Sequence, residues 1–247
     1  MPPIFMSLIL LLFVAAFFLL MLLKVQLSDS RFITKKRRNS KRYICLNPSW
    51  RVKGMFEWLV GPPNIQKVLA NLPETLEELD VGGTDIVGFP SPLPAGLKKL
   101  SARDCVSLLS VTSLPDSIEE LDFWGCEKLA ELPATLPAAL KELWVVSTAL
   151  KALPKLPAGL EQLDARCSEQ LAELHSEWPE FRLRPYGHGS LHWLNLCNTP
   201  AAANISGNLP EAVIAQIKKG GVAGWRMNKL AGDYQYAGEP MPRPVFL

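Results

Sequence analysis

The side chains most able to do covalent or metal chemistry in this 247-residue chain are its cysteines and histidines. The five cysteines are Cys45, Cys105, Cys126, Cys167 and Cys197. Their number is odd and no two form a CxxC pair, which argues against a disulfide framework and a zinc site and favours a reducing compartment. His188 and His192 lie in YGHGSLHW, a predicted glycine loop with no carboxylate close in sequence, and Ser190 lacks the GxSxG turn of a serine nucleophile. We therefore expect no catalytic residue, no metal and no cofactor.

One stretch, LDFWGCEKLAELP at residues 121–133, places Trp124 two positions from Cys126. A cysteine there could be an exposed nucleophile beside an aromatic wall, or a buried packing residue. Which of the two it is depends on the element that carries the stretch.

The stretch belongs to a repeat with a period of 20–22 residues. Five segments within residues 72–177 carry the pattern LPxx[LI]xxL, and they begin at Leu72, Leu93, Leu114, Leu136 and Leu156. Their frame matches the leucine-rich repeat, L-x-x-L-x-L-x-x-N/C-x-L. No single repeat can bury its own apolar face, so stacked repeats must share one core. The sequence predicts an α/β repeat solenoid, a leucine-rich-repeat horseshoe with short parallel strands on its concave face and small helical caps.

Each position in the repeat has a predicted direction, because side chains alternate between the two faces of a strand. In the third repeat Ile118, Leu121 and Phe123 point inward. Five residues after the second leucine comes a column of small side chains that can hydrogen-bond backbone: Thr84, Cys105, Cys126, Thr148 and Ser168. Cys126 is therefore predicted to be buried and unreactive, since a reactive thiolate needs exposure and positive neighbours.

The array is predicted to extend at both ends. Residues 47–71 are assigned to an N-terminal cap and a degenerate first repeat, and residues 178–206 to a degenerate last repeat and loop, with 178–189 as the candidate last strand. Within residues 207–247, a short helix is predicted at 208–221, with Asn208 as its N-cap and Gly220 as its end, followed by a loosely ordered tail.

The N-terminus carries twenty consecutive uncharged, almost wholly apolar residues, 4–23. As a helix they would be about 30 Å long, the thickness of a bilayer's hydrocarbon core. Residues 1–24 are therefore predicted to form a single-pass membrane anchor. The alternatives are a cleaved secretion signal, although no basic residue precedes the run, and an incorrectly assigned start codon.

Residues 25–46 are predicted to be a basic juxtamembrane linker. Its positive charge centres on Lys35, Lys36, Arg37 and Arg38. Because these charges follow the apolar span, the positive-inside rule places the repeat domain in the cytoplasm, and the cluster could hold anionic lipid head groups.

The net charge of +2 averages regions of opposite sign. Residues 24–42 hold eight Lys/Arg and one Asp, giving +7, whereas residues 72–177 hold eighteen Asp/Glu and eight Lys/Arg, giving −10. The basic run is short, lacks interleaved aromatic residues and adjoins an acidic domain, so no nucleic-acid partner is expected.

Partner contacts are expected on the concave face, through strand side chains that point away from the core. The residues predicted to contact a partner are Trp124, Trp144, Arg103, Arg166, Asp122, Asp164, Asp80 and Glu142. Trp and Arg are enriched in interface hot spots, and a mixed acidic and aromatic groove suits a protein or peptide better than a small molecule or a polyanion. The alternative is that one tryptophan folds over its neighbours and shields the sheet.

With its LPxxLxxL repeats, the chain resembles the LPX-type leucine-rich-repeat proteins of bacteria, in particular the repeat domain of type III secreted effectors of the YopM and IpaH type. The resemblance covers about residues 58–180 and implies the same fold. Some relatives carry a C-terminal ubiquitin-ligase domain with a catalytic Cys-x-Asp. None of the five cysteines here fits that pattern, and the residues after the array are too few for that domain. The apolar N-terminal span also departs from the family's usual soluble form.

The sequence thus predicts a non-catalytic protein–protein interaction module, monomeric and tethered to a membrane, that binds a protein partner on its concave face. Two alternatives stay open: a type III secreted bacterial effector acting in a host cell, and a remnant or subunit of a ubiquitin ligase.

Overall fold

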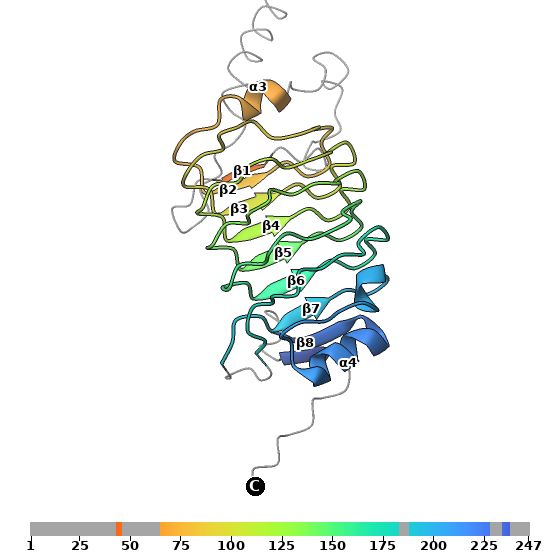
Figure 1. The fold of residues 1–247 in the computed structure, drawn as a ribbon. Helices are drawn as coiled ribbons and strands as arrows, with labels where there is room; N and C mark the ends of the chain where they lie inside the picture. Colours follow the sequence, from red (N-terminus) through yellow and green to blue (C-terminus); the bar gives the residue numbers. More distant parts are fainter. Residues whose placement is uncertain (1–42, 46–64, 183–187, 228–233, 238–247) are drawn as a thin grey trace, which may run out of the picture.

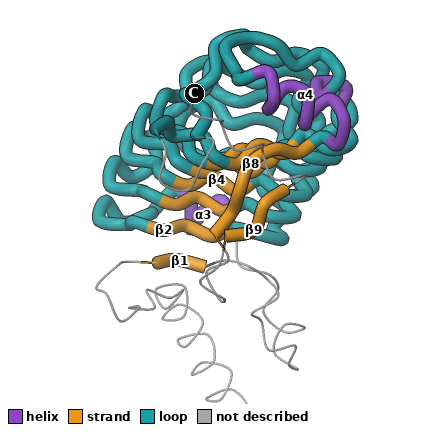
Figure 2. Tube along the Cα trace, turned by 90° about the horizontal axis from the view of Figure 1, so that it is seen from below, coloured by secondary structure: helices purple, strands orange, loops and turns teal. Residues whose placement is uncertain are grey.

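The structure is a computed structural model that describes residues 43–45, 65–182, 188–227 and 234–237. Within these residues one sheet of nine strands, β1 to β9, follows the order of the sequence. Figure 1 shows β1 to β8 following one another along the solenoid. Seven strands are parallel: β1 (Tyr43–Cys45), β2 (Glu78–Asp80), β3 (Lys99–Ser101), β4 (Glu120–Asp122), β5 (Glu142–Trp144), β6 (Gln162–Asp164) and β7 (Trp193–Asn195). The antiparallel β8 (Val222–Met227) and β9 (Tyr234–Ala237) complete it. The strands line one side of the solenoid, and loops form most of the rest (Figure 2).

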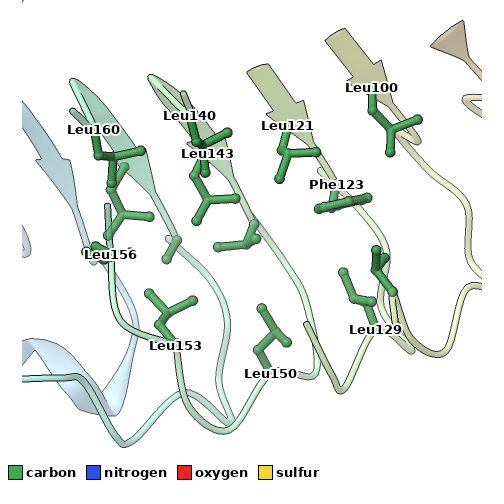
Figure 3. Close-up of a cluster of buried hydrophobic side chains, with 14 of the residues drawn as sticks. Leu100, Leu121, Phe123, Leu129, Leu140, Leu143, Leu150, Leu153, Leu156 and Leu160 are labelled. Carbon is green, nitrogen blue, oxygen red and sulfur yellow. The ribbon is translucent and has the colours of Figure 1, made fainter. Parts of the chain in front are cut away.

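The core consists of ladders of equivalent side chains, because the strands pair without a shift in register. Leu79 pairs with Leu100, Leu100 pairs with Leu121, and the ladder continues to Leu194 of β7. These leucines are at most 1% exposed, as predicted. Phe123 lies among them in the interior, between the strands and the returning loops (Figure 3). Burying a side chain of this size stabilises the fold by about 1.5–3 kcal/mol.

A residue in the left-handed region follows each of the strands β2 to β7 and turns the chain toward the core. These residues have φ between 54° and 74°, and they are Gly83, Asp104, Gly125, Ser147, Cys167 and Asn198. The residue after each of the first five belongs to the predicted polar column, which is confirmed: Cys126 Sγ donates to the Ala102 carbonyl at 3.0 Å, and Ser168 Oγ donates to the Val145 carbonyl at 2.8 Å. The small polar side chains thus pair their own buried polar groups with backbone carbonyls of the same or the preceding repeat.

The N-terminal end of the sheet differs from the prediction. β1 lies at residues 43–45, which the sequence assigned to the end of the basic linker, and it pairs in parallel with β2. Of the predicted degenerate first repeat, residues 65–71 are described, and they contain a short helix, α3 (Ile65–Leu69), rather than a strand. The expected anchor, residues 4–23, and the basic cluster lie outside the described residues. No helix in the described part of the chain is long and apolar enough to cross a membrane.

The last parallel strand also lies elsewhere than predicted. It is β7, whereas in the predicted segment 178–189 Phe181 makes only an isolated bridge with Leu191. Leu191, Leu194 and Leu196 repeat the L-x-x-L-x-L spacing, and all three are fully buried. The strand was missed because this repeat lacks the Leu-Pro signature of the other five.

Helix α4 (Glu211–Gly220) forms as predicted and ends at Gly220, but its N-terminus differs. Pro210 occupies the N-cap position, and Gly221, with φ of 73°, takes the left-handed position after the helix. A short 3-10 helix, η2 (Pro200–Ala202), lies between β7 and α4. Asn208 is not the cap: its amide accepts from the Trp178 backbone N–H at 2.7 Å and donates to the Trp178 carbonyl at 2.9 Å. Asn208 therefore ties two segments thirty residues apart.

Part of the tail that was expected to be loosely ordered forms β9, and β8 lies between the predicted helix and that tail. β8 runs antiparallel to β7, with Gly224 opposite Trp193. Gly224 has φ of 111°, and a Cβ there would lie 2.0 Å from the His192 carbonyl oxygen, so glycine is required for this close approach.

Candidate functional site

Three columns of residues on β2 to β6 point away from the core, and together they are called the open face. The first column is Glu78, Lys99, Glu120, Glu142 and Gln162; the second is Asp80, Ser101, Asp122, Trp144 and Asp164; the third, just beyond the strands, is Gly82, Arg103, Trp124, Val146 and Arg166. The pairing register sets members of a column side by side. All eight residues predicted to contact a partner lie on this face.

Trp124 is the centre of a cation–π cluster. The Cζ atom of Arg103 lies 5.3 Å from the Trp124 ring centroid, and that of Arg166 lies 4.8 Å from it. Arg103 also lies 6.0 Å from the ring of Trp144. Contacts of this kind at exposed sites contribute roughly 0.5–1 kcal/mol each. The cluster joins side chains from four successive repeats.

Aspartates hold both arginines in place. Arg103 Nε donates to Asp122 Oδ2 at 2.5 Å, and Arg166 Nε lies 3.7 Å from Asp164 Oδ1. A guanidinium fixed on one side by a carboxylate has fewer orientations in which to meet the ring of Trp124. The open face is therefore ordered before any partner arrives.

Trp124 and Arg166 also cover part of the sheet. Val146 lies between them in the third column and is only 2% exposed, although it points away from the core. The tryptophan and the arginine approach each other across it. The alternative that a tryptophan shields the sheet thus has a physical basis for Trp124, whose own side chain stays half-buried.

The second-column aspartates shape the chain as well as carrying charge. Asp80, Asp122 and Asp164 each accept the backbone N–H two residues further on, at 2.9, 3.2 and 3.3 Å. Asn195 does the same in the next repeat. Asp164 is only 4% exposed. Its main role is therefore to pair with Arg166 and to stabilise the turn that follows β6. Asp80 and Asp122 remain half-buried.

Trp144 has acidic neighbours on three strands. Asp122 on β4 and Asp164 on β6 pair with it in register, and Glu142 precedes it by two residues on β5. Glu142 pairs with Glu120, which makes a salt bridge with Lys99 of β3. Lys99 and Glu120 were not among the predicted contacts. The opposite charges of Lys99 and Glu120 at equivalent positions of adjacent repeats were the signal that could have included them.

The cysteine beside Trp124 is a packing residue. Cys105 and Cys126 are both fully buried. Burial raises the pKa of each thiol, and with the neighbouring Cys105 adding to the effect it raises the pKa of Cys126 to about 12. Both thiols therefore stay protonated at neutral pH, and each donates to a backbone carbonyl. Protonated, buried thiols do not act as nucleophiles.

His192 is not the loop residue that the sequence suggested. It is buried just before β7, where its ring stacks on Trp225 of β8 with centroids 4.3 Å apart. Its Nδ1 lies 3.1 Å from the Trp225 carbonyl, which can only accept, so Nδ1 carries the proton. Burial lowers the pKa of His192, although Glu161, 3.9 Å from Nε2, acts in the opposite direction. His188 is exposed, and the described residues contain no group of three or more His, Cys, Asp or Glu that could hold a metal ion.

One three-residue strand per repeat of 20–22 residues, paired in register around a leucine core, defines a leucine-rich-repeat solenoid. No protein-family model matches the chain. A stretch of 99 residues is 33% identical to part of an Arabidopsis thaliana protein described as a "probable disease resistance protein", and the match covers 38% of this chain and 6% of that protein. Among solved structures, YopM from Yersinia enterocolitica is similar with a TM-score of 0.38 and 23% identity, over 57% of this chain and 36% of that one. The chain thus spans only a minor part of the length of either protein.

Proposed function

We propose that this protein is a non-catalytic interaction module that binds a protein partner on its open face. The observation that carries the proposal is the cluster of Arg103, Trp124, Trp144 and Arg166 on the open face. Tryptophan and arginine supply a disproportionate share of binding energy at protein interfaces, because they combine a large apolar area with directional polar contacts. A preordered surface also loses less side-chain entropy on binding.

A photo-crosslinking residue placed at Ser101 of the open face tests the proposal. Ser101 lies between Asp80 and Asp122 in the second column and is half-buried, so a substituent there would lie against a bound partner. We expect a crosslinked adduct from Ser101 and none from Ala172, an exposed position in the loop after β6. The adduct should disappear when Trp124 and Trp144 are both changed to Ala. An adduct that survives this double change would exclude the two tryptophans as the contact.

We further propose that residues 4–23 tether the module to a membrane and leave the repeats in the cytoplasm. Support comes from the length and apolar character of the run and from the basic residues that follow it. Full-length chain should sediment with membranes and resist extraction at high pH, whereas a chain lacking residues 1–24 should not. Full-length chain in the soluble fraction would contradict the tether, and chain in the culture medium would favour a secreted effector instead.

A further inference from the structure

The charge of the open face indicates what kind of segment would bind there. The first two columns contain one cation, Lys99, and six carboxylates: Glu78, Asp80, Glu120, Asp122, Glu142 and Asp164. The third column contains Arg103 and Arg166 and no acid. Six carboxylates against three cations leave the face with a net charge of −3, and the acidic columns lie side by side along the solenoid. We propose that the partner presents an extended, basic segment to these columns; the inference rests on the proposed function.

The most specific place for a cation is over Trp144. The register of β4 and β5 sets Glu120 beside Glu142 and Asp122 beside Trp144, so three carboxylates and one indole occupy two adjacent strands. Neighbouring strands are about 4.8 Å apart, so one side-chain cation over the ring lies within reach of all three carboxylates. An aromatic face with carboxylates around it favours a lysine or arginine side chain over any anion. A polyanion would meet net repulsion.

The protein's own cations partly fill this place in the free protein. Arg103 lies 6.0 Å from the Trp144 ring and is bound to Asp122, and Lys99 is bound to Glu120. Arg103 is exposed and Lys99 is half-buried, and ion pairs at such positions contribute little net stability. A cation from a partner can therefore displace Arg103 or Lys99 from its carboxylate, or bind beside it, with little loss of stability. Trp124 is a poorer binding site for a partner's cation, because two guanidinium groups already lie over its ring.

A peptide titration tests the inference on the full-length chain in nanodiscs of zwitterionic lipid. The probe is a nine-residue peptide of alternating glycine and arginine, and its control has glutamine at each arginine. We expect the arginine peptide to bind and the glutamine peptide not to bind. The double variant Glu120→Gln, Glu142→Gln should weaken binding about tenfold or more, and Trp144→Leu should weaken it at unchanged charge.

A matched variant separates a specific site from general attraction to an acidic protein. Glu169→Gln with Glu173→Gln removes the same charge from exposed positions in the loop after β6, and it should leave the affinity within about twofold. Equal binding of the glutamine peptide, or equal weakening by the two double variants, would overturn the inference.

Two further outcomes identify what occupies the face if the inference fails. If Ser101 still crosslinks to a partner while the arginine peptide does not bind, the proposed function stands and the basic character of the segment is wrong. If the peptide binds only after Lys35, Lys36, Arg37 and Arg38 are changed to Gln, the face accepts a basic segment, but the chain's own rather than a partner's, which overturns the inference.

Discussion

The five LP repeats and the C-terminal end of the sheet are held together by different kinds of contact. In residues 72–177 each stabilising contact recurs: a leucine ladder, a left-handed turn and a small polar side chain bound to backbone appear in every repeat. At the C-terminal end β7 continues the ladder through Leu194, but the contacts that attach the segments after it each occur once. Trp225 stacks on His192, Asn208 holds the backbone of Trp178, and Gly224 allows β8 to approach β7.

This difference determines how a defect should spread. An inner repeat depends on neighbours on both sides, so a cavity in one ladder weakens the repeats that stack on it. The C-terminal strands cover the last ladder from one side only. A defect among their single contacts should therefore open β8 and β9 while leaving the inner repeats folded.

Phe123→Ala should cost about 3–5 kcal/mol of unfolding free energy, because the ring is fully buried and the cavity would lie between two stacked repeats. Denaturant unfolding measures the loss, and hydrogen exchange should show β3, β4 and β5 all losing protection. Phe123→Leu, which keeps most of the volume, should cost much less. A loss below about 1 kcal/mol for the alanine variant would mean that the core can collapse around the gap.

Gly224→Ala should cost more than about 1 kcal/mol, because alanine disfavours φ of 111° and its Cβ would lie 2.0 Å from the His192 carbonyl oxygen. Loss of hydrogen-exchange protection should be confined to β7, β8 and β9. Gly220→Ala is the matched control, since it ends α4 with no atom within 4 Å of the added Cβ. Equal loss of protection in β3 would show that the two regions are not independent.

His192 should make the C-terminal end sensitive to acid. Its folded pKa is lowered by burial, whereas the unfolded chain keeps a value of about 6.5. Below pH 6.5 the unfolded state therefore binds a proton that the folded state does not. The unfolding free energy should then fall by up to about 1.4 kcal/mol per pH unit until the folded pKa is reached, with no contribution above pH 6.5.

His192→Phe, which keeps an aromatic ring on Trp225, should remove this dependence, while a change at the exposed His188 should not. Proteolysis or exchange of β8 as a function of pH measures the effect. If the wild-type chain loses no stability between pH 7 and pH 5, then the carboxylate of Glu161, next to Nε2, stabilises the protonated ring enough to offset the effect of burial on the pKa of His192.

Arg166→Ala should have the smallest effect, about 0.5–1 kcal/mol, because it removes one cation–π contact and exposes Val146 on the open face. The hydrogen-exchange pattern of the inner repeats should be unchanged. Arg166→Lys keeps the charge but loses the planar group, and should recover only part of the loss. A loss of unfolding free energy above about 2 kcal/mol would mean that Trp124 and Arg166 serve mainly to shield the sheet from solvent.

The interior of the repeats could be read from the sequence because a strand side chain has only two directions. Once the LPxx[LI]xxL frame is found, the direction of Leu121, Phe123 and Trp124 follows, and the polar column that buries Cys126 lies at a fixed distance. The ends could not be read in this way. β1 has only three residues and no repeat frame, and β7 has the leucine spacing without the Leu-Pro.

On the open face, too, some features follow from the sequence and others only from the tertiary structure. The sequence determined that Arg103, Trp124 and Arg166 share a face, because strand alternation is local. That both arginines meet one indole, that Val146 is covered and that Asp164 is nearly buried were decided by the tertiary structure. Residues about twenty positions apart become neighbours only when the repeats stack, and long side chains then reach across two strands. Direction is a property of the local chain, whereas contact between distant repeats depends on the whole packing.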